Sequence, residues 1–189
     1  MTALDESFFA RDALVVARAL VGTRIVHGDK TARIVETEAY RGPRDLACHA
    51  RAGLTKRTTT LFGPPGHAYV FLIYGMYDCF NVVCKAAGAG HAVLVRGAEV
   101  EGHKADGPGK FARAMGFTRK HDGESLMTEH LHLLPRDRRV RIGVSARVGV
   151  QYAQEWADAK YRFFDALSQH VSKPSWRQIG RGTSKATPK

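Results

Sequence analysis

Apolar residues recur at helical spacing near the start of the chain, and the pattern ends at a glycine. The apolar residues of the segment Asp12–Val21 include Leu14, Val15, Ala17, Leu20 and Val21. Positions three and four apart lie on one face of a helix, so this spacing predicts an amphipathic helix. We expect the helix to end at Gly22, because glycine is common directly after a helix.

Runs rich in β-branched and aromatic residues then predict strands. Thr23–His27 and Ala32–Ala39 are expected to pair as a hairpin. The densest run, His67–Lys85, is interrupted only near Gly75 and predicts a second hairpin. Further strands are predicted at Ala92–Arg96, Val140–Ser145 and Tyr161–Phe164. Further short helices are predicted around Ala153–Ala159 and from the segment Gly107–Lys110, which opens a helix, to Gly116, which closes it.

The mixture of hairpins and short helices predicts an α+β fold with a largely antiparallel sheet. The polar stretch Arg41–Gly66 is punctuated by Gly and Pro, and loops of this length are usually functional. Lys, Arg, Ser, Gly and Pro dominate the chain from Lys173 onward. We therefore expect a flexible basic C-terminal tail over residues 173–189, after a single domain over residues 1–172.

The charge balance narrows the choice of partner. The 189 residues include 29 Lys and Arg against 18 Asp and Glu, a formal net charge of +11. Such a surplus favours a polyanion, with nucleic acid first and an anionic membrane surface second. A basic protein without a polyanionic ligand stays a third alternative.

Sequence features also bear on location. No apolar run approaches the ~18 residues of a membrane span, and the acidic N-terminus lacks the character of a signal peptide. The three cysteines form no CxxC pair, which favours free thiols in a reducing compartment. We expect an intracellular protein of the cytoplasm or nucleoid that does not enter a membrane.

Two acidic residues interrupt an otherwise apolar predicted strand. Side chains alternate along a strand, so Glu36, Glu38 and Tyr40 share one face. If Thr37 and Ala39 face the core, the acids face either solvent or a cleft. Neighbours on one strand face lie about 7 Å apart and side by side. Their spacing alone therefore does not establish a catalytic pair across a sugar, as in glycosidases.

Three other motifs do not predict the sites that they first suggest. The Glu129–His132 segment lacks further ligands at zinc spacing. The Gly88–Val93 segment lacks the third glycine of a dinucleotide-binding loop and precedes a strand. The Gly107–Lys110 segment lacks the Ser or Thr of a P-loop, although a helix N-terminus there is able to hold a phosphate. We predict neither a metal nor a cofactor.

An ordered series of short segments carries a family resemblance. The segments are Ala17–Gly22, Arg33–Tyr40, Gly42–Pro43, His49–Arg51, Phe62–Val70, Ile73–Met76, Asn81–Val83, Val93–Arg96, Gly107–Lys110, Ala146–Val150 and Glu155–Trp156. Together they resemble the alkyladenine (3-methyladenine) DNA glycosylase family, from about residue 8 to 165. The resemblance implies one domain with a curved sheet and a protruding β-hairpin, flanked by short helices.

The resemblance also implies roles for individual residues. Glu38 would deprotonate the attacking water, and Arg96 would help to hold that water. The pocket for the extruded base would be lined by Tyr40, His49, Phe71 and Asn81. Phe71 would stack on the base, and Asn81 would exclude the exocyclic amine of guanine. The residues entering the minor groove would be Tyr74, Ile73 and Met76.

The implied activity is that of a monofunctional purine DNA glycosylase in base excision repair. Such an enzyme extrudes an alkylated or deaminated purine from duplex DNA and hydrolyses its N-glycosidic bond, leaving an abasic site. Its partners would be damaged double-stranded DNA and a catalytic water, and we expect a monomer. Two alternatives stay open: a non-catalytic, damage-sensing DNA-binding protein, and a carbohydrate hydrolase that uses both acids. The chain departs from the family pattern at Thr58, Phe71 and Asp78, where asparagine, tyrosine and an uncharged aromatic are usual.

Overall fold

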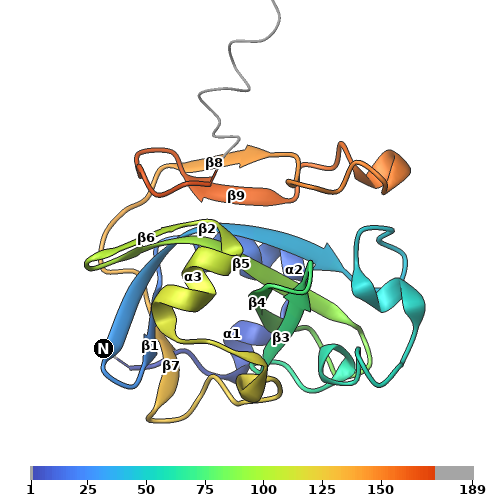
Figure 1. Ribbon diagram of the computed structural model, residues 1–189, viewed down its shortest axis with the longest axis horizontal. Helices are drawn as coiled ribbons and strands as arrows, with labels where there is room; N and C mark the ends of the chain where they lie inside the picture. Colours follow the sequence, from blue (N-terminus) through green and yellow to red (C-terminus); the bar gives the residue numbers. More distant parts are fainter. Residues whose placement is uncertain (1, 173–189) are drawn as a thin grey trace, which may run out of the picture.

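The computed structural model describes residues 2–172. Its strands form a single antiparallel sheet. Its strands are β1 (Arg24–His27), β2 (Lys30–Arg41), β3 (Ala68–Ile73), β4 (Tyr77–Cys84), β5 (His91–Val100), β6 (His103–Asp106), β7 (Leu131–Leu134), β8 (Ile142–Ser145) and β9 (Arg162–Asp165). The main path runs β3-β4-β5-β2-β1-β7. Strand β6 pairs with β5. Strands β8 and β9 pair with each other, and β9 also pairs with residues Glu36–Glu38 of β2 (Figure 1).

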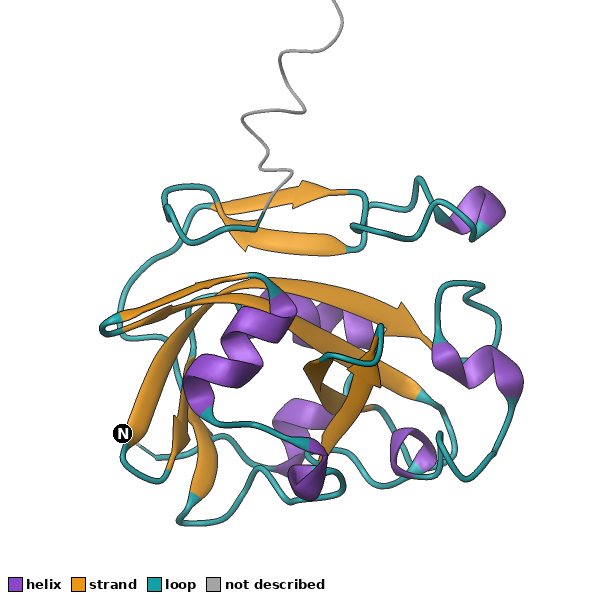
Figure 2. Ribbon diagram, in the orientation of Figure 1, coloured by secondary structure: helices purple, strands orange, loops and turns teal. Residues whose placement is uncertain are grey.

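Three α-helices in the described part of the chain pack against the curled sheet (Figure 2). They are α1 (Glu6–Phe9), α2 (Ala13–Leu20) and α3 (Pro108–Met115). One hydrophobic core contains residues of all three helices together with the inward faces of β1 to β7. The predictions of an α+β fold, a curved antiparallel sheet and short flanking helices are confirmed.

The ends of helices α2 and α3 follow from their sequences. The Asp12 side chain caps α2 by accepting a hydrogen bond from the Leu14 N–H at 3.0 Å. In α3, Pro108 occupies the first turn, where its missing N–H costs nothing. Gly116 ends α3 with φ +76°, a left-handed conformation that glycine adopts without steric cost.

A register irregularity between β2 and β5 shapes the centre of the sheet. Glu36 lies opposite Gly97, whereas Thr37 lies opposite Val95, so Arg96 has no partner residue in this ladder. Such bulges bend a strand and redirect a side chain, and they are common beside active sites. Here the Arg96 side chain contacts both acids of β2.

Several elements differ from the sequence-based expectations. Strand β5 extends beyond Ala92–Arg96 at both ends, and α1, β6 and β7 were not predicted. The predicted helix at Ala153–Ala159 is a single 3-10 turn over Gln154–Trp156. Two further 3-10 turns, at His49–Ala52 and Thr60–Phe62, lie in the long loop. The predicted tail, residues 173–189, lies outside the described residues.

Within residues 2–172, no helix has the length and apolar character needed to cross a membrane.

Candidate active site

The register of four strands brings one residue from each into a row. Tyr69 of β3 pairs with Asn81 of β4, Asn81 pairs with Leu94 of β5, and Leu94 pairs with Glu38 of β2. Cross-strand partners project from the same face of a sheet. The opposite face of β3 and β4 carries core residues such as Val70 and Phe80. The sheet therefore presents Glu38 and Asn81 together on the face that is turned away from the main core.

A cavity of about 440 Å³ lies over this row. Its walls include all four predicted pocket residues, together with Arg96, Ile73 and Tyr74. The opposite wall comes from the start of α3 and from the loop after β8, including Val148 and Tyr152. Residues as far as 112 positions apart in the sequence thus enclose one cavity. Its volume is large enough for a small aromatic molecule.

Aromatic side chains form one wall of the cavity. The ring centroids of His49 and Phe71 are 4.4 Å apart, with the planes at 67°. A ring nitrogen of His49 lies 3.0 Å from the Tyr69 hydroxyl. Burial lowers the pKa of His49, and the positive charge of Arg57 lowers it further. This wall therefore presents a neutral imidazole and apolar ring surface at neutral pH.

The amide of Asn81 is held in a defined orientation at the floor. Its Nδ2 donates to the carbonyls of Tyr69 at 3.0 Å and Cys79 at 3.3 Å. Since both amide donor directions are used by backbone carbonyls, the amide oxygen is the group left for another partner.

Glu38 lies behind the cavity wall, with no exposed surface. Its Oε1 accepts a hydrogen bond from the Val148 N–H at 2.7 Å, and its Oε2 accepts one from the Tyr40 hydroxyl at 3.0 Å. The Arg96 guanidinium approaches the carboxylate at the longer distances of 3.4 and 3.5 Å. Burial raises the pKa of Glu38, although Arg96 and the Val148 N–H act in the opposite direction. All three partners also line the cavity.

The interpretation that the two acids lie on a solvent-exposed strand face is wrong. Thr37 and Ala39 do face the core, but Glu36 and Glu38 are also completely buried. Arg96 and Arg162 cover the acidic face, and both guanidinium groups contact Glu36. A charged residue in the apolar predicted strand Tyr161–Phe164 was the signal that could have located this cover.

Sequence reasoning assigned no role to Arg147, whose guanidinium lies against the ring of Tyr40. Arg147 donates to both carboxylate oxygens of Asp45 at 2.6 and 2.9 Å, and the pair is fully buried. Its guanidinium carbon lies 4.8 Å from the centre of the Tyr40 ring. Burial raises the pKa of Tyr40 well above its ordinary value, as does the negative charge of Glu38. The Tyr40 hydroxyl therefore stays protonated and donates to Glu38.

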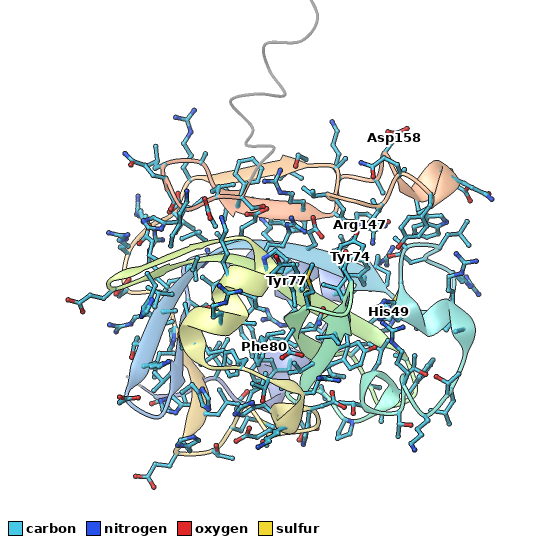
Figure 3. The ribbon with its side chains drawn as sticks, in the orientation of Figure 1. His49, Tyr74, Tyr77, Phe80, Arg147 and Asp158 are labelled. Atoms are coloured by element: carbon cyan, nitrogen blue, oxygen red, sulfur yellow. The ribbon has the colours of Figure 1, made fainter. Side chains whose placement is uncertain are left out.

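The tip of the β3–β4 hairpin stands at the mouth of the cavity. Tyr74 is 82% exposed and Met76 is 68% exposed, whereas Ile73 is partly buried against the cavity. His49, Tyr74, Tyr77 and Arg147 gather in one region of the molecule (Figure 3). The hairpin thus presents an unsupported aromatic side chain directly beside the pocket.

Two departures from the family pattern have local partners. Asp78, next to the hairpin tip, lies 3.5 Å from the Arg119 guanidinium, which offsets its negative charge. The Thr58 hydroxyl donates to the Gly53 carbonyl at 2.8 Å and accepts from the Thr55 N–H at 2.8 Å. Thr58 therefore ties together part of the long loop that carries His49.

Comparison with known proteins identifies the family. The family model described as methylpurine-DNA glycosylase matches residues 7–169 of the chain. The chain belongs to the methylpurine-DNA glycosylase family. A member from Myxococcus xanthus (strain DK1622) is 53% identical over 184 residues, which cover 92% of this chain and 95% of the relative. A member from Legionella pneumophila (strain Lens) is 44% identical, with coverages of 92% and 100%. Both relatives carry the name "Putative 3-methyladenine DNA glycosylase".

Membership of the methylpurine-DNA glycosylase family confirms the resemblance and the prediction of a DNA N-glycosylase. It favours this enzyme over the non-catalytic DNA-binding protein and the carbohydrate hydrolase. Among residues 2–172, no three His, Cys, Asp or Glu side chains are grouped so as to hold a metal ion. The roles of the individual site residues and the monomeric state stay predictions.

Proposed function

We propose that the chain is a monofunctional glycosylase that extrudes alkylated or deaminated purines, 3-methyladenine among them, from duplex DNA and hydrolyses their N-glycosidic bonds. The abasic site left behind would then be processed in base excision repair. The observation that carries the proposal is the buried Glu38 carboxylate, held by three residues of an aromatic-walled cavity.

The shape of the cavity supports binding of an extruded purine. A base stacked in a duplex is out of reach of a buried carboxylate, so it must leave the stack, at a cost of a few kcal/mol. Phe71 and His49 offer ring surface to the extruded base, and a cationic alkylpurine gains roughly 0.5–2 kcal/mol from such a surface. The fixed Asn81 amide supports selection at the floor, where its oxygen accepts and does not donate.

The contacts of Glu38 support its role as general base. In the proposed step, a water oxygen bonds to C1′ while its proton passes to Glu38. The bond between C1′ and the purine nitrogen breaks, and the purine leaves with the electron pair. Arg96 contacts the carboxylate only at 3.4 and 3.5 Å, so a water is best able to enter between these two groups, where both are able to hold it. A base with a raised pKa also accepts a proton more readily than an ordinary carboxylate.

The exposed hairpin tip supports a second part of the proposal. Tyr74 would fill the space that the extruded nucleotide leaves, with Ile73 and Met76 beside it. Inserted side chains of this kind unstack and kink the duplex through the minor groove. The formal charge of +11 supports binding to the phosphate backbone.

The proposal is tested with end-labelled duplexes that each carry one hypoxanthine, ethenoadenine or 7-methylguanine. Incubation with the protein should produce strand breaks only after treatment with hot alkali, because a monofunctional glycosylase leaves an intact abasic strand. Breaks before alkali would show a lyase instead. Absence of abasic sites with all lesions, despite measurable binding, would contradict the proposed activity.

A further inference from the structure

A second buried carboxylate lies beside the proposed base and has no part in the bond-breaking step. Glu36 is completely buried and accepts hydrogen bonds from four groups. Its Oε1 accepts from Arg162 at 2.6 Å, from the Ser172 hydroxyl at 2.8 Å and from Arg96 at 3.2 Å. Its Oε2 accepts from the Ser172 N–H at 2.6 Å. Glu36 is thus more closely surrounded by donors than Glu38.

Charge balance explains why this arrangement matters for Arg96. The two buried carboxylates, Glu36 and Glu38, are matched by two buried guanidinium groups, Arg96 and Arg162. Arg162 contacts Glu36 at 2.6 Å, which is closer than the 3.2 Å between Arg96 and Glu36. Because Arg162 also pairs with Glu36, Arg96 is able to share its charge between Glu36 and Glu38. Without these partners, Glu36 would draw Arg96 away from the proposed base.

Ser172 joins three members of this group from the end of the described chain. Besides its two hydrogen bonds to Glu36, its carbonyl accepts from Arg162 at 3.1 Å. Its hydroxyl oxygen lies 3.3 and 3.4 Å from the Nη2 and Nε of Arg96. A hydroxyl has one donor and two acceptor sites, so it is able to donate to Glu36 while accepting from Arg96. Ser172 is 2% exposed, so water does not readily substitute for these bonds.

The chain just before Ser172 passes close to strand β5 at His170. A Cβ atom added to Gly97 would lie 2.7 Å from the His170 carbonyl oxygen and 3.2 Å from Glu36 Oε2. The first distance is too short for any real Cβ contact, so the segment passes this close only because position 97 is glycine. The segment thus lies against the residue that follows Arg96 in the chain.

We propose that Glu36 and Ser172 are positioning residues, which hold the Arg96 guanidinium between the two carboxylates and thereby keep Glu38 paired with a cation. The inference rests on the proposed function of Glu38 as the base. It assigns a part in the active site to Ser172, which is more than 130 residues from Glu38 in the sequence. Removal of the Ser172 hydroxyl would let Arg96 move toward Glu36, and Glu38 would then hold its proton more tightly.

The test compares Ser172→Ala with Ser172→Thr, which keeps the hydroxyl. Ser168→Ala is the matched control, because its hydroxyl in the same segment donates to Glu99 at 2.9 Å, outside the active site. Single-turnover release of 7-methylguanine is measured against pH and against enzyme concentration, with the melting temperature of each variant. We expect Ser172→Ala to lower the rate constant near neutral pH roughly tenfold. The free energy of one hydrogen bond to a charged group corresponds to at least a tenfold change in rate.

The pattern across pH separates positioning from a merely structural role. The acidic limb of the Ser172→Ala profile should move to higher pH, with the half-saturating concentration unchanged. Ser172→Thr and Ser168→Ala should retain the wild-type limb. A wild-type rate and limb for Ser172→Ala would overturn the inference, as would a lower rate with an unshifted limb. If Glu38→Gln released the base at the wild-type rate, the proposed role of Glu38 as the base would fail first and this inference with it, whereas the absence of abasic sites with the wild-type protein would contradict the glycosylase activity itself.

Discussion

Glu38 combines two properties that oppose one another in most proteins. It has no exposed surface, yet its carboxylate is surrounded by donors from Val148, Tyr40 and Arg96. Burial disfavours the charged form, whereas the cation and the hydrogen bonds favour it. The balance raises the pKa of Glu38 above its ordinary value of 4.5. The ionised form of a base tuned in this direction depends on the partners that oppose the effect of burial.

The pH dependence of base release should reveal this tuning. The ionised form of Glu38 is the active base, so the rate constant should fall as pH decreases through the raised pKa. With 7-methylguanine, whose cationic base leaves without further protonation, we expect a rising limb that lies above pH 4.5, followed by a plateau. With hypoxanthine, a neutral leaving group, the rate should fall again at high pH. The measurement is single-turnover release between acid and alkaline pH, with folding checked by circular dichroism at each point. A rate for 7-methylguanine that stays constant down to pH 4.5 would contradict the account.

Sequence reasoning at the residue scale was limited by what each pattern records. Alternation along the strand correctly placed Glu36, Glu38 and Tyr40 on one face. It said nothing of what covers that face, because Arg162 and Ser172 arrive from a distant part of the chain. The roles of the predicted pocket residues came from family resemblance, and the structure brings those residues together around one cavity.

At the element scale, the β3–β4 hairpin holds a strained residue at its tip. Tyr74 has φ +51° and is followed by Gly75 with φ +69°. A left-handed conformation costs a non-glycine residue roughly 1–2 kcal/mol. Tight hairpin turns favour consecutive residues with positive φ, and glycine and asparagine are the usual choices. A tyrosine at this position therefore serves something other than the stability of the turn.

Replacement of Tyr74 should separate stability from function. In Tyr74→Gly, relief of strain offsets the greater flexibility of glycine in the unfolded chain, so the melting temperature should stay the same or rise. The preference for lesion-containing over undamaged duplex should fall roughly tenfold or more, since stacking on an aromatic ring contributes about 1–3 kcal/mol. Tyr74→Phe keeps the ring and should retain the preference. Competition binding with matched duplexes measures it, and an unchanged preference in Tyr74→Gly would argue against insertion of this side chain.

Local signals predicted some elements well and missed others. The helix between Pro108 and Gly116 has clear signals at both ends, and the structure begins and ends it there. Strand β7 (Leu131–Leu134) was missed because its four residues include a histidine and overlap the Glu129–His132 segment, which resembles metal ligands. The extension of β5 and the bulge at Arg96 depend on pairing with β2, which no local pattern encodes. Helix α1 spans only four residues, too few for a periodicity to show.

At the scale of the whole molecule, the excess of positive charge should determine much of the affinity for DNA. Residues 173–189 contain Lys173, Arg177, Arg181, Lys185 and Lys189 and no acidic residue, so they supply five of the formal net charge of +11. Cations that neutralise phosphates release counterions, and binding then weakens linearly in the logarithm of salt concentration. The contribution of these five residues to DNA binding is therefore measurable as a change in the salt dependence of the affinity.

Substitution of glutamine for those five residues should make the salt dependence shallower. Each lost phosphate contact reduces the slope by about 0.9. The single-turnover rate constant at saturating enzyme should stay unchanged, because the cavity and Glu38 are intact. Truncation is less suitable, since it would turn the Ser172 carbonyl, which accepts from Arg162 beside Glu36, into a charged carboxylate. Equal slopes for the two proteins, measured on undamaged duplex, would show that these residues do not contact DNA.

The account depends most directly on Glu38 as the base. The decisive measurement is single-turnover release of 7-methylguanine by Glu38→Gln, together with the affinity of the variant for the same duplex. The amide keeps the shape of the side chain but is unable to take a proton from water. Release should fall by roughly 10²–10⁴-fold, the usual contribution of a general base, while lesion binding is retained. Release at the wild-type rate by this folded, DNA-binding variant would contradict the central claim.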